Sequence, residues 1–393
     1  MKKTIKLLII LILLIPLNIK AIELDISSKN AILYNIDNNE ILYEKNSNDK
    51  VQIASLTKIM TALVSIENIE DLDKQIIINN SDFKNVQKYN LVTAGFTVGE
   101  VVTYKDLLYG LLLPSGADAA KALARNIAGS EEEFIILMNK KVQDLNLKNT
   151  NFSNVIGLDD ENNYSTVKDL FIIFKKALEN ETFKKMIKTK EYKTTDGKLT
   201  FKSTIQKNAK AFNIDIPYVL GGKTGTTTKA GLCLATIAKE NGTNYILITT
   251  GALYDKKAPH HIEDAKIIYD YFIQNYSNQK IVDKNISYKT LKTKYSKETK
   301  IKLYPSKDII KYLPNNYEKK DIKYEYNGVE EVTPFTKNKL GTLKIYYQNK
   351  LIRKENVYLK NRPSFSLIAF IKSNIIVIPL TIILIILIKR ARK

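Results

Sequence analysis

The amino-acid sequence predicts a mixed α/β (α+β) domain, then a small all-β domain, and then a C-terminal transmembrane helix. Three successive patterns support this order. Residues 22–277 mix helical and strand-like hydrophobic spacing, residues 281–362 alternate apolar and polar residues in short runs, and residues 367–388 are mostly apolar. The roughly 340 residues between the two ends of the chain are too many for one hydrophobic core and suffice for two domains.

Residues 1–21 have the pattern of an export signal. Lysines precede the apolar run from Leu7 to Leu17, which is too short to span a bilayer, and Ala21 is a suitable last residue of such a signal. A buried N-terminal helix is the alternative, but polar residues follow the segment at once. We therefore expect the signal to direct the rest of the chain out of the cytoplasm.

Residues 367–388 have the pattern of a membrane anchor. Residues 375–388 are apolar apart from one proline and one threonine, and a helix that begins near Leu367 would be long enough to cross the hydrocarbon core. The basic residues 389–393 would then stay in the cytoplasm by the positive-inside rule. An amphipathic helix on the membrane surface is the alternative, although residues 375–388 are apolar all round. The pattern predicts a single-pass protein of the cell membrane.

The overall composition narrows the possible partners and chemistry. The formal net charge is +20, but a chain outside the cytoplasm is not expected to bind nucleic acid. The basic charge suits anionic wall polymers or lipid headgroups, and a general bias toward lysine explains it equally well. The only cysteine, Cys233, lies in an apolar run and is expected in the core. We expect no metal and no cofactor.

Strands and helices are expected to alternate through residues 22–277. The turns Asp37-Asn38-Asn39 and Asn241-Gly242 each join two strands, and Pro114-Ser115-Gly116 separates two helices. Apolar residues at spacings of three and four mark the helical segments. The expected strands are a pair within Asn30 to Tyr43, Gly231 to Ile237 and Asn244 to Gly251, and the expected helices are Ile53 to Glu67, Lys105 to Leu113, Asp118 to Ile127, the segment after Thr166, and Pro259 to Tyr276.

Residues 281–362 are expected to form the all-β domain. Short alternating runs such as Lys300-Ile301-Lys302-Leu303 favour strands with one buried face, and tyrosine is frequent. No residue pattern in this segment suggests catalysis. The chemistry of the protein is therefore expected in residues 22–277.

The first motif that suggests chemistry is Ser55-Leu56-Thr57-Lys58. Ser-x-x-Lys occurs five times in the chain, but only the copy at Ser55 opens a long helix with one apolar face. Side chains at i and i+3 share a helix face, and free N–H groups with the helix dipole would favour an anionic Ser55 in the first turn. Lys58, partly removed from water, could accept the proton of Ser55. The alternative is a serine at a helix start with a lysine on the exposed face.

A second motif, Lys223-Thr224-Gly225, occurs once. A phosphate-binding loop would need a glycine six residues before Lys223, and that position is Pro217. On a strand edge, Gly225 would let the backbone of a substrate approach closely. Lys223 would add a positive charge and Thr224 a hydroxyl, and Thr226 would present its backbone N–H to the substrate.

A nucleophile that depends on lysine also agrees with the histidine content. The chain has two histidines, His260 and His261, and both lie where a surface helix is expected to begin. A Ser-His-Asp hydrolase would have to use one of them. The two histidines therefore argue against a triad of that type.

Together these motifs resemble the serine D-alanyl-D-alanine carboxypeptidases, which are low-molecular-mass penicillin-binding proteins. The resemblance covers about residues 24 to 276. It implies a penicilloyl-serine-transferase or β-lactamase-like fold, with an antiparallel sheet flanked by helices. The matching segments are Ala54 to Leu63, Leu107 to Gly116, Asn151-Phe152, Gly157-Leu158, Tyr164 to Thr166, Gly221 to Thr227 and Ala230 to Leu234.

The resemblance implies hydrolysis of the terminal D-Ala-D-Ala bond of peptidoglycan stem peptides, which trims pentapeptides and limits crosslinking. Ser55 would attack the carbonyl carbon, with Lys58 as its base, and Ser115 would relay a proton to the leaving D-alanine. Water would then release the acyl group, whereas β-lactam antibiotics would acylate Ser55 and remain. The implied substrate-binding residues are Lys223, Thr224, Gly225 and Thr226, with the N–H groups of Ser55 and Thr226 forming the oxyanion hole.

One position departs from the family pattern. The second motif is usually Ser-x-Asn, and here it is Ser115-Gly116-Ala117, which lacks the amide of asparagine. The neighbouring Asp118 is expected to point elsewhere on its helix. A non-catalytic or weakly active penicillin-binding module is therefore an alternative. An endopeptidase that cuts crosslinks and a β-lactamase with Glu161 or Glu191 as second base are others.

Overall fold

The computed structural model describes residues 22–375 and 377–391, and the chain divides into two compact units between Gln274 and Asn275. The expected export signal, residues 1–21, lies outside the described residues. The mixed α/β domain followed by a β domain is confirmed. We describe each unit by itself.

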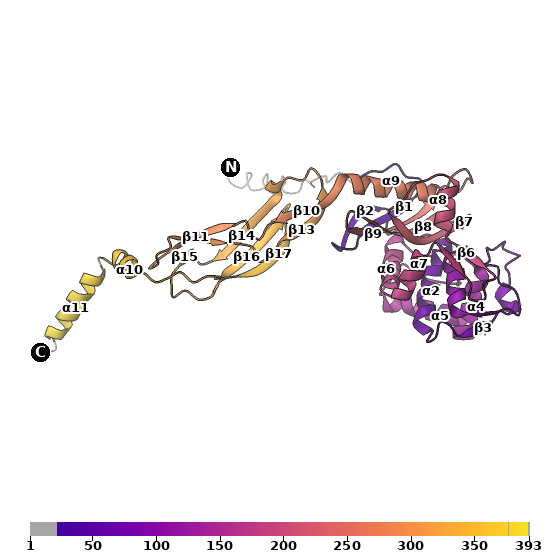
Figure 1. Ribbon diagram of the computed structural model, residues 1–393, viewed down its shortest axis with the longest axis horizontal. Coiled ribbons are helices and arrows are strands. Elements are labelled where there is room, and N and C mark those ends of the chain that lie inside the picture. The colour runs from indigo at the N-terminus through magenta and orange to yellow at the C-terminus, as the bar shows by residue number, and fades with distance from the viewer. Residues whose placement is uncertain (1–21, 376, 392–393) are drawn as a thin grey trace, which may run out of the picture. The chain divides into compact units, whose positions relative to one another are not determined.

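The first unit is built on a five-stranded antiparallel sheet in the order β2-β1-β9-β8-β7 (Figure 1). All six residues of β1 are buried, as expected for a strand in the middle of a covered sheet. Asn241 and Gly242 both have positive φ, 48° and 76°, which suits the tight turn between β8 and β9. The strands are β1 (Asn30–Asn35), β2 (Glu40–Lys45), β7 (Val219–Thr227), β8 (Gly231–Glu240) and β9 (Thr243–Ala252).

Helices cover both faces of this sheet. α9 (His260–Asn275) lies along one face, where Tyr269 on α9 and Thr236 on β8 hydrogen bond at 2.9 Å (Figure 1). On the other face, the Phe171 ring of α6 packs against Tyr34 of β1, with ring centroids 4.3 Å apart. The remaining helices are α2 (Thr57–Asn68), α3 (Tyr104–Leu112), α4 (Ala117–Ala128), α5 (Glu131–Asp144), α6 (Val167–Leu178), α7 (Glu181–Lys188) and α8 (Thr204–Ala211).

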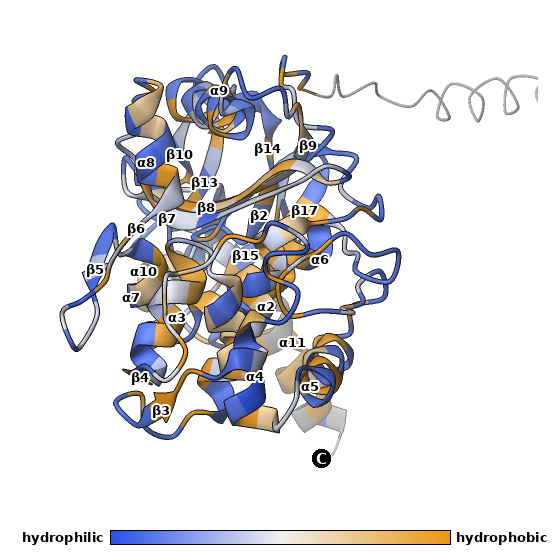
Figure 2. Ribbon diagram, turned by 90° about the vertical axis from the view of Figure 1, so that its right-hand side faces the viewer, coloured by the Kyte–Doolittle hydropathy of each residue, from blue (hydrophilic) through white to orange (hydrophobic). Residues whose placement is uncertain are grey.

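The helix α2 is the central helix of the first unit. Its first nine residues, Thr57 to Ser65, are all buried, and it contacts α3, α4, α5, α6 and α7. The sequence analysis expected the apolar residues on one face and Lys58 partly removed from water, and the alternative of Lys58 on an exposed face is wrong. Because helices surround α2 on several sides, its polar residues, including Lys58, are enclosed as well. Figure 2 shows hydrophobic residues on the central strands and on the helices beneath them.

Short elements complete the first unit. Two small antiparallel strand pairs lie outside the main sheet. There are also two 3₁₀ turns among the described residues of this unit: η1 (Ala54–Leu56) directly before α2, and η2 (Asn80–Phe83) between β3 and β4. Cys233 is fully buried in the core, as expected. The two strand pairs are β3 (Gln75–Ile77) with β4 (Val101–Thr103) and β5 (Glu191–Lys193) with β6 (Thr200–Lys202).

The second unit is built almost entirely from short strands around its own core. Val282, Leu343 and Ile345 are fully buried in that core, and the strands form small sheets of two or three members. The elements are β10 (Tyr276–Val282), β11 (Lys289–Thr293), β12 (Lys300–Leu303), β13 (Ile309–Pro314), η3 (Lys319–Asp321), β14 (Ile322–Gly328), β15 (Glu331–Val332), β16 (Lys339–Tyr347) and β17 (Lys350–Tyr358).

The apolar C-terminal segment forms two helices rather than one. α10 (Leu367–Ser373) ends before Asn374, whose side-chain amide donates to the carbonyl of Phe370, and α11 (Val377–Ala391) follows. The expected single helix over residues 367–388 is therefore interrupted. Across residues 22–375 and 377–391, the helices are all too short or too polar to cross a membrane.

Candidate active site

Ser55 lies in the 3₁₀ turn η1, immediately before the helix α2, rather than in the first turn of α2 as expected. The preceding residue, Ala54, has φ of 48°, which is rare for a residue other than glycine. Such backbone persists only when its surroundings hold it in place. The turn therefore presents Ser55 in a fixed and unusual geometry.

Two glycines let neighbouring segments of the chain pack closely against this turn. A Cβ atom on Gly157 would lie 1.9 Å from the carbonyl oxygen of Ala54, and one on Gly225 would lie 2.9 Å from the nitrogen of Ser55. Gly157 also has φ of 85°, which favours glycine. Gly225 of the Lys-Thr-Gly motif thus packs β7 directly against the backbone of the serine. This close approach explains why both motifs form one site.

Lys58 and Ser55 hydrogen bond in the geometry that proton transfer requires. The Lys58 Nζ donates to Ser55 Oγ at 3.1 Å and to the carbonyl oxygen of Ile156 at 2.9 Å. Lys58 is almost fully buried, and burial lowers its pKa to about 7, although the nearby charge of Asp118 opposes this shift. A large fraction of Lys58 is therefore neutral near pH 7 and able to accept the proton of Ser55.

Asp118 is directed away from the substrate side, as the sequence suggested. Its carboxylate accepts hydrogen bonds from the backbone N–H groups of Ala94, Gly95 and Phe96 at 2.7, 3.2 and 3.3 Å. Burial raises the pKa of Asp118, and these backbone donors counter that rise. Asp118 therefore anchors a loop of the pocket and does not replace the missing asparagine of the second motif.

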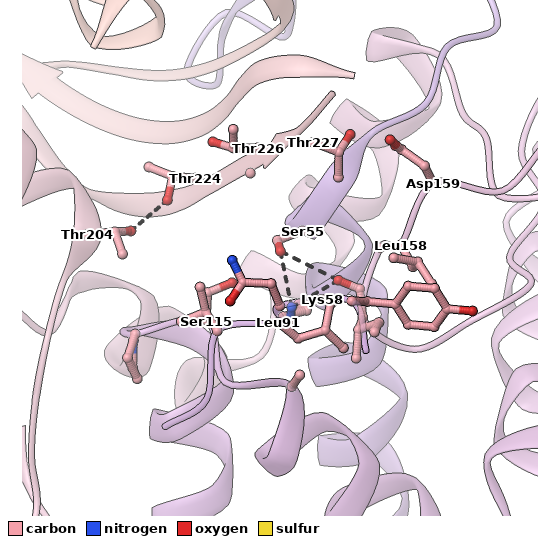
Figure 3. Close-up of a pocket in the computed structure, with 18 of the residues that line it drawn as sticks. Ser55, Lys58, Leu91, Ser115, Leu158, Asp159, Thr204, Thr224, Thr226 and Thr227 are labelled. Atoms are coloured by element: carbon pink, nitrogen blue, oxygen red, sulfur yellow. Dashed lines mark hydrogen bonds between the residues drawn. The ribbon is translucent and has the colours of Figure 1, made fainter. Parts of the chain in front are cut away.

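Ser115 and Ala117 lie on the wall of the pocket that contains Ser55. Figure 3 shows Ser115 there. Ser115 has φ of 71°, so its backbone is also in the left-handed region. The loop is held by the N–H of Gly116, which donates to Gly110, and by the N–H of Ala117, which donates to Val92, both at 2.8 Å. The structure thus brings Ser115 to the same cavity as Ser55 and Lys58.

Lys223 is fully buried and does not line the pocket. Its Nζ donates to the carbonyl oxygen of Thr224 at 2.7 Å. Burial, and then the nearby charge of Lys58, lower the pKa of Lys223 well below the usual value for lysine. The structure therefore gives Lys223 no direct contact surface for a substrate, in contrast to the expected role. Lys223 is itself a residue of β7, and its influence on the site is through its charge close to Lys58.

The outer face of β7 supplies hydroxyl groups to the pocket. Thr224, Gly225 and Thr226 line it, and Thr224 Oγ1 lies 2.7 Å from the Oγ1 of Thr204 at the start of α8. Figure 3 shows this pair on one side of Ser55. The sequence analysis missed Thr204 because no motif marks it and α8 was not expected. A substrate carboxylate could accept hydrogen bonds from both hydroxyls.

The cavity itself has a volume of about 820 Å³ and is bounded by loops as well as by regular elements. Loop residues 89–92 and 156–159 form part of its wall, and the carbonyl of Ile156 contacts Lys58 directly. The sequence analysis did not identify Ile156 or Asp159, since neither has a residue type or spacing that indicates a role. The other lining residues are Pro114, Thr200, Lys202, Lys207, Asn208, Thr227 and Thr228.

Comparisons with known proteins decide the family. A family model described as D-alanyl-D-alanine carboxypeptidase matches residues 18–253, and a model of the C-terminal domain of penicillin-binding protein 5 matches residues 276–362. The chain belongs to the D-alanyl-D-alanine carboxypeptidase family. The expected resemblance is thereby confirmed.

Similar proteins within this family span most of the chain. D-alanyl-D-alanine carboxypeptidase DacF of Bacillus subtilis is 33% identical over 347 residues, which are 86% of each chain. The DD-transpeptidase of Streptomyces K15 is 31% identical in its crystal structure, with a TM-score of 0.57, and covers 64% of this chain and 98% of its own. Penicillin-binding protein 5 of Haemophilus influenzae shares the fold, with 24% identity, a TM-score of 0.63 and coverage of 87% and 99%.

The remaining carboxylate and imidazole candidates lie away from this cavity. Glu161 and Glu191, the acids considered for a β-lactamase, are both exposed and neither lines the pocket. His261 is buried on α9, not on a surface as expected, because α9 packs this face against the sheet. His260 hydrogen bonds to Glu263 and Asp255 on the outside of α9. None of the four residues is placed to assist Ser55.

Proposed function

We propose that this protein hydrolyses the bond between the last two D-alanines of peptidoglycan stem peptides. The observation that carries the proposal is the hydrogen bond of 3.1 Å between Ser55 and a buried Lys58, at the wall of an open cavity, in a chain of this family. A serine beside a lysine of lowered pKa is an activated nucleophile. The names of the relatives support the same reaction.

The proposed reaction has two steps. Ser55 Oγ attacks the carbonyl carbon of the penultimate D-alanine while Lys58 takes the hydroxyl proton, and an ester forms as the C–N bond breaks. The proton passes to the leaving amine, with Ser115, which lines the same cavity, as the relay. Water then attacks the ester carbonyl, and its proton passes by way of Lys58 to Ser55 Oγ. The ester bond breaks, which releases the shortened peptide as a free acid and restores the Ser55 hydroxyl. The N–H groups of Ser55 and Thr226 are proposed to stabilise the oxyanion.

The terminal carboxylate of the substrate is proposed to lie at Thr204 and Thr224. Their hydroxyls lie 2.7 Å apart on one side of Ser55, and the exposed Lys202 and Lys207 line the same cavity. Hydroxyl donors backed by positive charge suit a carboxylate. A β-lactam carries a carboxylate and a reactive carbonyl at a similar separation, so the same arrangement supports covalent inhibition by penicillins.

The replacement of Ser55 tests the proposed nucleophile. Ser55→Ala should abolish both D-alanine release from a D-Ala-D-Ala peptide and covalent labelling by a fluorescent penicillin, because no oxygen remains to form the ester. The matched control is Ser81→Ala, since Ser81 starts another Ser-x-x-Lys and is exposed on η2. A folded Ser55→Ala protein that still takes up penicillin would refute the assignment. A wild-type protein that takes up no penicillin and releases no D-alanine would favour the non-catalytic alternative.

We further infer that the protein is exported by residues 1–21 and held at the outer face of the membrane by residues 367–388. Support comes from the side chains of Ile382 to Ile388 on α11, all of which are exposed and apolar. Burying such surface in lipid is strongly favourable. Basic residues follow in the sequence and suit the anionic inner leaflet.

A truncated chain tests this attachment. A protein that ends at Pro363 lacks both α10 and α11 and should appear in the soluble fraction with its activity on a D-Ala-D-Ala peptide retained. The full-length protein is the control and should pellet with membranes. If the truncated protein still pellets after a salt wash, the C-terminal segment is not its only attachment.

A further inference from the structure

One end of the second unit exposes large apolar side chains. The parallel strands β11 and β15 both end there, and Phe335 lies in the loop that follows β15. Phe335 is 69% exposed, more than any other aromatic side chain that the structure describes. Phe365 and the α10 residues Leu367, Ile368 and Ile371 are exposed as well. Exposed apolar side chains gathered in this way mark an interaction surface.

A turn with its own hydrogen bonds holds Phe335 in place. The N–H of Thr333 donates to Thr336 Oγ1 at 2.8 Å, and the N–H of Thr336 donates back to the carbonyl oxygen of Thr333 at 3.1 Å. The Arg362 guanidinium donates to the carbonyl oxygen of Pro334 at 3.1 Å. These bonds shape the turn without the Phe335 ring, which adds little to folding because it buries little apolar surface. The ring is therefore available to another surface, and its backbone is already in position.

The apolar C-terminal segment begins at the same end of the unit, without an intervening linker. The N–H of Ser366 donates to the carbonyl oxygen of Tyr295, in the loop after β11, at 2.9 Å. The rings of Phe335 and Phe365 pack with their centroids 6.0 Å apart. Leu367, the first residue of α10, follows Phe365 by two residues, a span of at most about 7 Å. Wherever residues 367–388 are held, Phe335 is therefore held close by.

The surroundings of this turn suit a lipid surface better than a second protein. Residues 367–388, which begin beside Phe335, are the segment proposed to lie in the membrane, so lipid is the nearest apolar phase. Lys337 and Arg362 are exposed, and neither forms an ion pair within the described part of the chain. Anionic headgroups attract such cations, and aromatic rings are favoured at the membrane interface. The headgroup layer on each side of a bilayer is about 5–8 Å deep, so a ring beside Leu367 reaches it.

We propose that the second unit contacts the outer leaflet of the membrane directly, with Phe335 inserted among the lipid headgroups. The inference rests on the proposed attachment by residues 367–388 and adds a contact made by the β domain itself. The partner is a phospholipid bilayer with anionic headgroups. One phenyl ring in lipid is too weak an anchor to hold the protein there alone. The contact instead fixes which end of the second unit faces the membrane, which a flexible tether would leave free.

Tryptophan fluorescence tests the contact, because the chain contains no tryptophan of its own. Full-length Phe335→Trp is reconstituted in vesicles of phosphatidylglycerol and phosphatidylcholine, with and without bromine on the acyl chains near the headgroups. Bromine quenches only fluorophores that touch the lipid, so the brominated vesicles should reduce the emission of this variant. Leu351→Trp is the matched control. Leu351 is also exposed, but it pairs with Tyr346, roughly 24 Å along β16 from the end of that strand that follows Phe335. Its emission should be equal in both kinds of vesicle.

Each other outcome contradicts the proposal in its own way. Both side chains are exposed in the wild type, so each variant should keep the wild-type melting temperature. Equal emission of Phe335→Trp in brominated and plain vesicles would show that the turn does not meet lipid. If this tryptophan is then also shielded from aqueous iodide, a second copy of the chain covers it instead. Equal quenching of Leu351→Trp would show that the unit lies flat on the membrane. Failure of the full-length wild type to float with the vesicles would refute the proposed attachment, and the inference with it.

Discussion

The pocket has two kinds of wall, and they differ in what holds them. One wall consists of η1, α2 and β7, where backbone meets backbone so closely that Gly225 can carry no side chain. The other consists of loop segments around Leu91, Ser115 and Asp159, which hydrogen bonds tie to neighbouring segments. The first wall carries the nucleophile and its base. The second carries Ser115, the proposed proton relay, and loop residues that surround the acyl part of a substrate, whereas Thr224 of the proposed carboxylate site belongs to β7 on the first wall.

This difference separates chemistry from selectivity. Bond cleavage needs Ser55 and Lys58 within hydrogen-bond distance, and only rigid, buried elements keep that distance constant. Selectivity needs contacts that can change while the chemistry stays the same, and loops on a rigid scaffold allow such change. We therefore expect substitutions on the first wall to have large effects on all substrates. Substitutions on the second wall other than at Ser115 should have smaller effects that depend on the substrate.

After the loss expected for Ser55→Ala, the largest expected effect is on the first wall, at Lys58. Lys58→Ala should slow acylation by penicillin by about 10²- to 10⁴-fold, which is the usual contribution of a general base. The measurement is the rate of covalent labelling by a fluorescent penicillin. Lys84→Ala, in the exposed Ser-x-x-Lys that begins at Ser81, serves as control and should label at the wild-type rate. A loss of less than tenfold would show that another group removes the proton from Ser55.

The pH dependence of acylation should reveal the same group. Because burial lowers the pKa of Lys58 to about 7, its neutral form increases with pH up to that value and then saturates. The acylation rate should therefore rise about tenfold per pH unit well below pH 7 and level off above it. Stopped-flow acylation between pH 5 and pH 9 measures the curve. The residual acylation rate of Lys58→Ala should lack this rise with pH. If Lys58→Ala keeps the wild-type pH dependence, the titrating group is not Lys58.

The same shift has a consequence for stability with a definite sign. The folded protein releases the proton of Lys58 near pH 7, whereas an unfolded chain keeps it up to the ordinary lysine pKa near 10.4. The cost of burying Lys58 is therefore complete below about pH 7 and disappears as pH rises toward 10. Lys58→Met should for that reason raise the melting temperature more at pH 6 than at pH 9. The loss of stability from burying Lys58 thus accompanies the lowered pKa that lets Lys58 act as the base for Ser55.

The features that the sequence predicted are those that local patterns decide, and the features that it did not predict depend on contacts between distant segments. The Ser55 and Lys223 motifs, the order of strands and helices, and the separate β domain all came from spacing and residue type, because local patterns decide regular elements. The enclosure of α2 did not, since it depends on helices far away in sequence. The sequence also did not identify Thr204, Ile156 or Asp159 as residues of the site. A backbone carbonyl, a lone threonine and one acid among many acquire a role only when the tertiary fold brings them to Ser55.

The smallest expected effect is on the second wall, at Ala117. Ala117 is buried at the start of α4 and lines the pocket, where the usual asparagine of the family would present an amide. If the missing amide limits how the peptide is positioned, Ala117→Asn should raise kcat/KM on a D-Ala-D-Ala peptide by about two- to tenfold, the value of one regained hydrogen bond of about 0.5–1.5 kcal/mol.

Penicillin provides the internal control for Ala117→Asn. Its rigid ring system holds the reacting carbonyl without help from that amide, so its acylation rate should change less than the peptide rate. The opposite outcome is expected if the loop has no room for the larger asparagine side chain. Gly116 beside it already has Asp118 and Ala94 within 3 Å of where a Cβ would lie, so the loop has little room to shift. A fall in both rates with an unchanged melting temperature would show that this wall is built around alanine and is not a damaged version of the usual site.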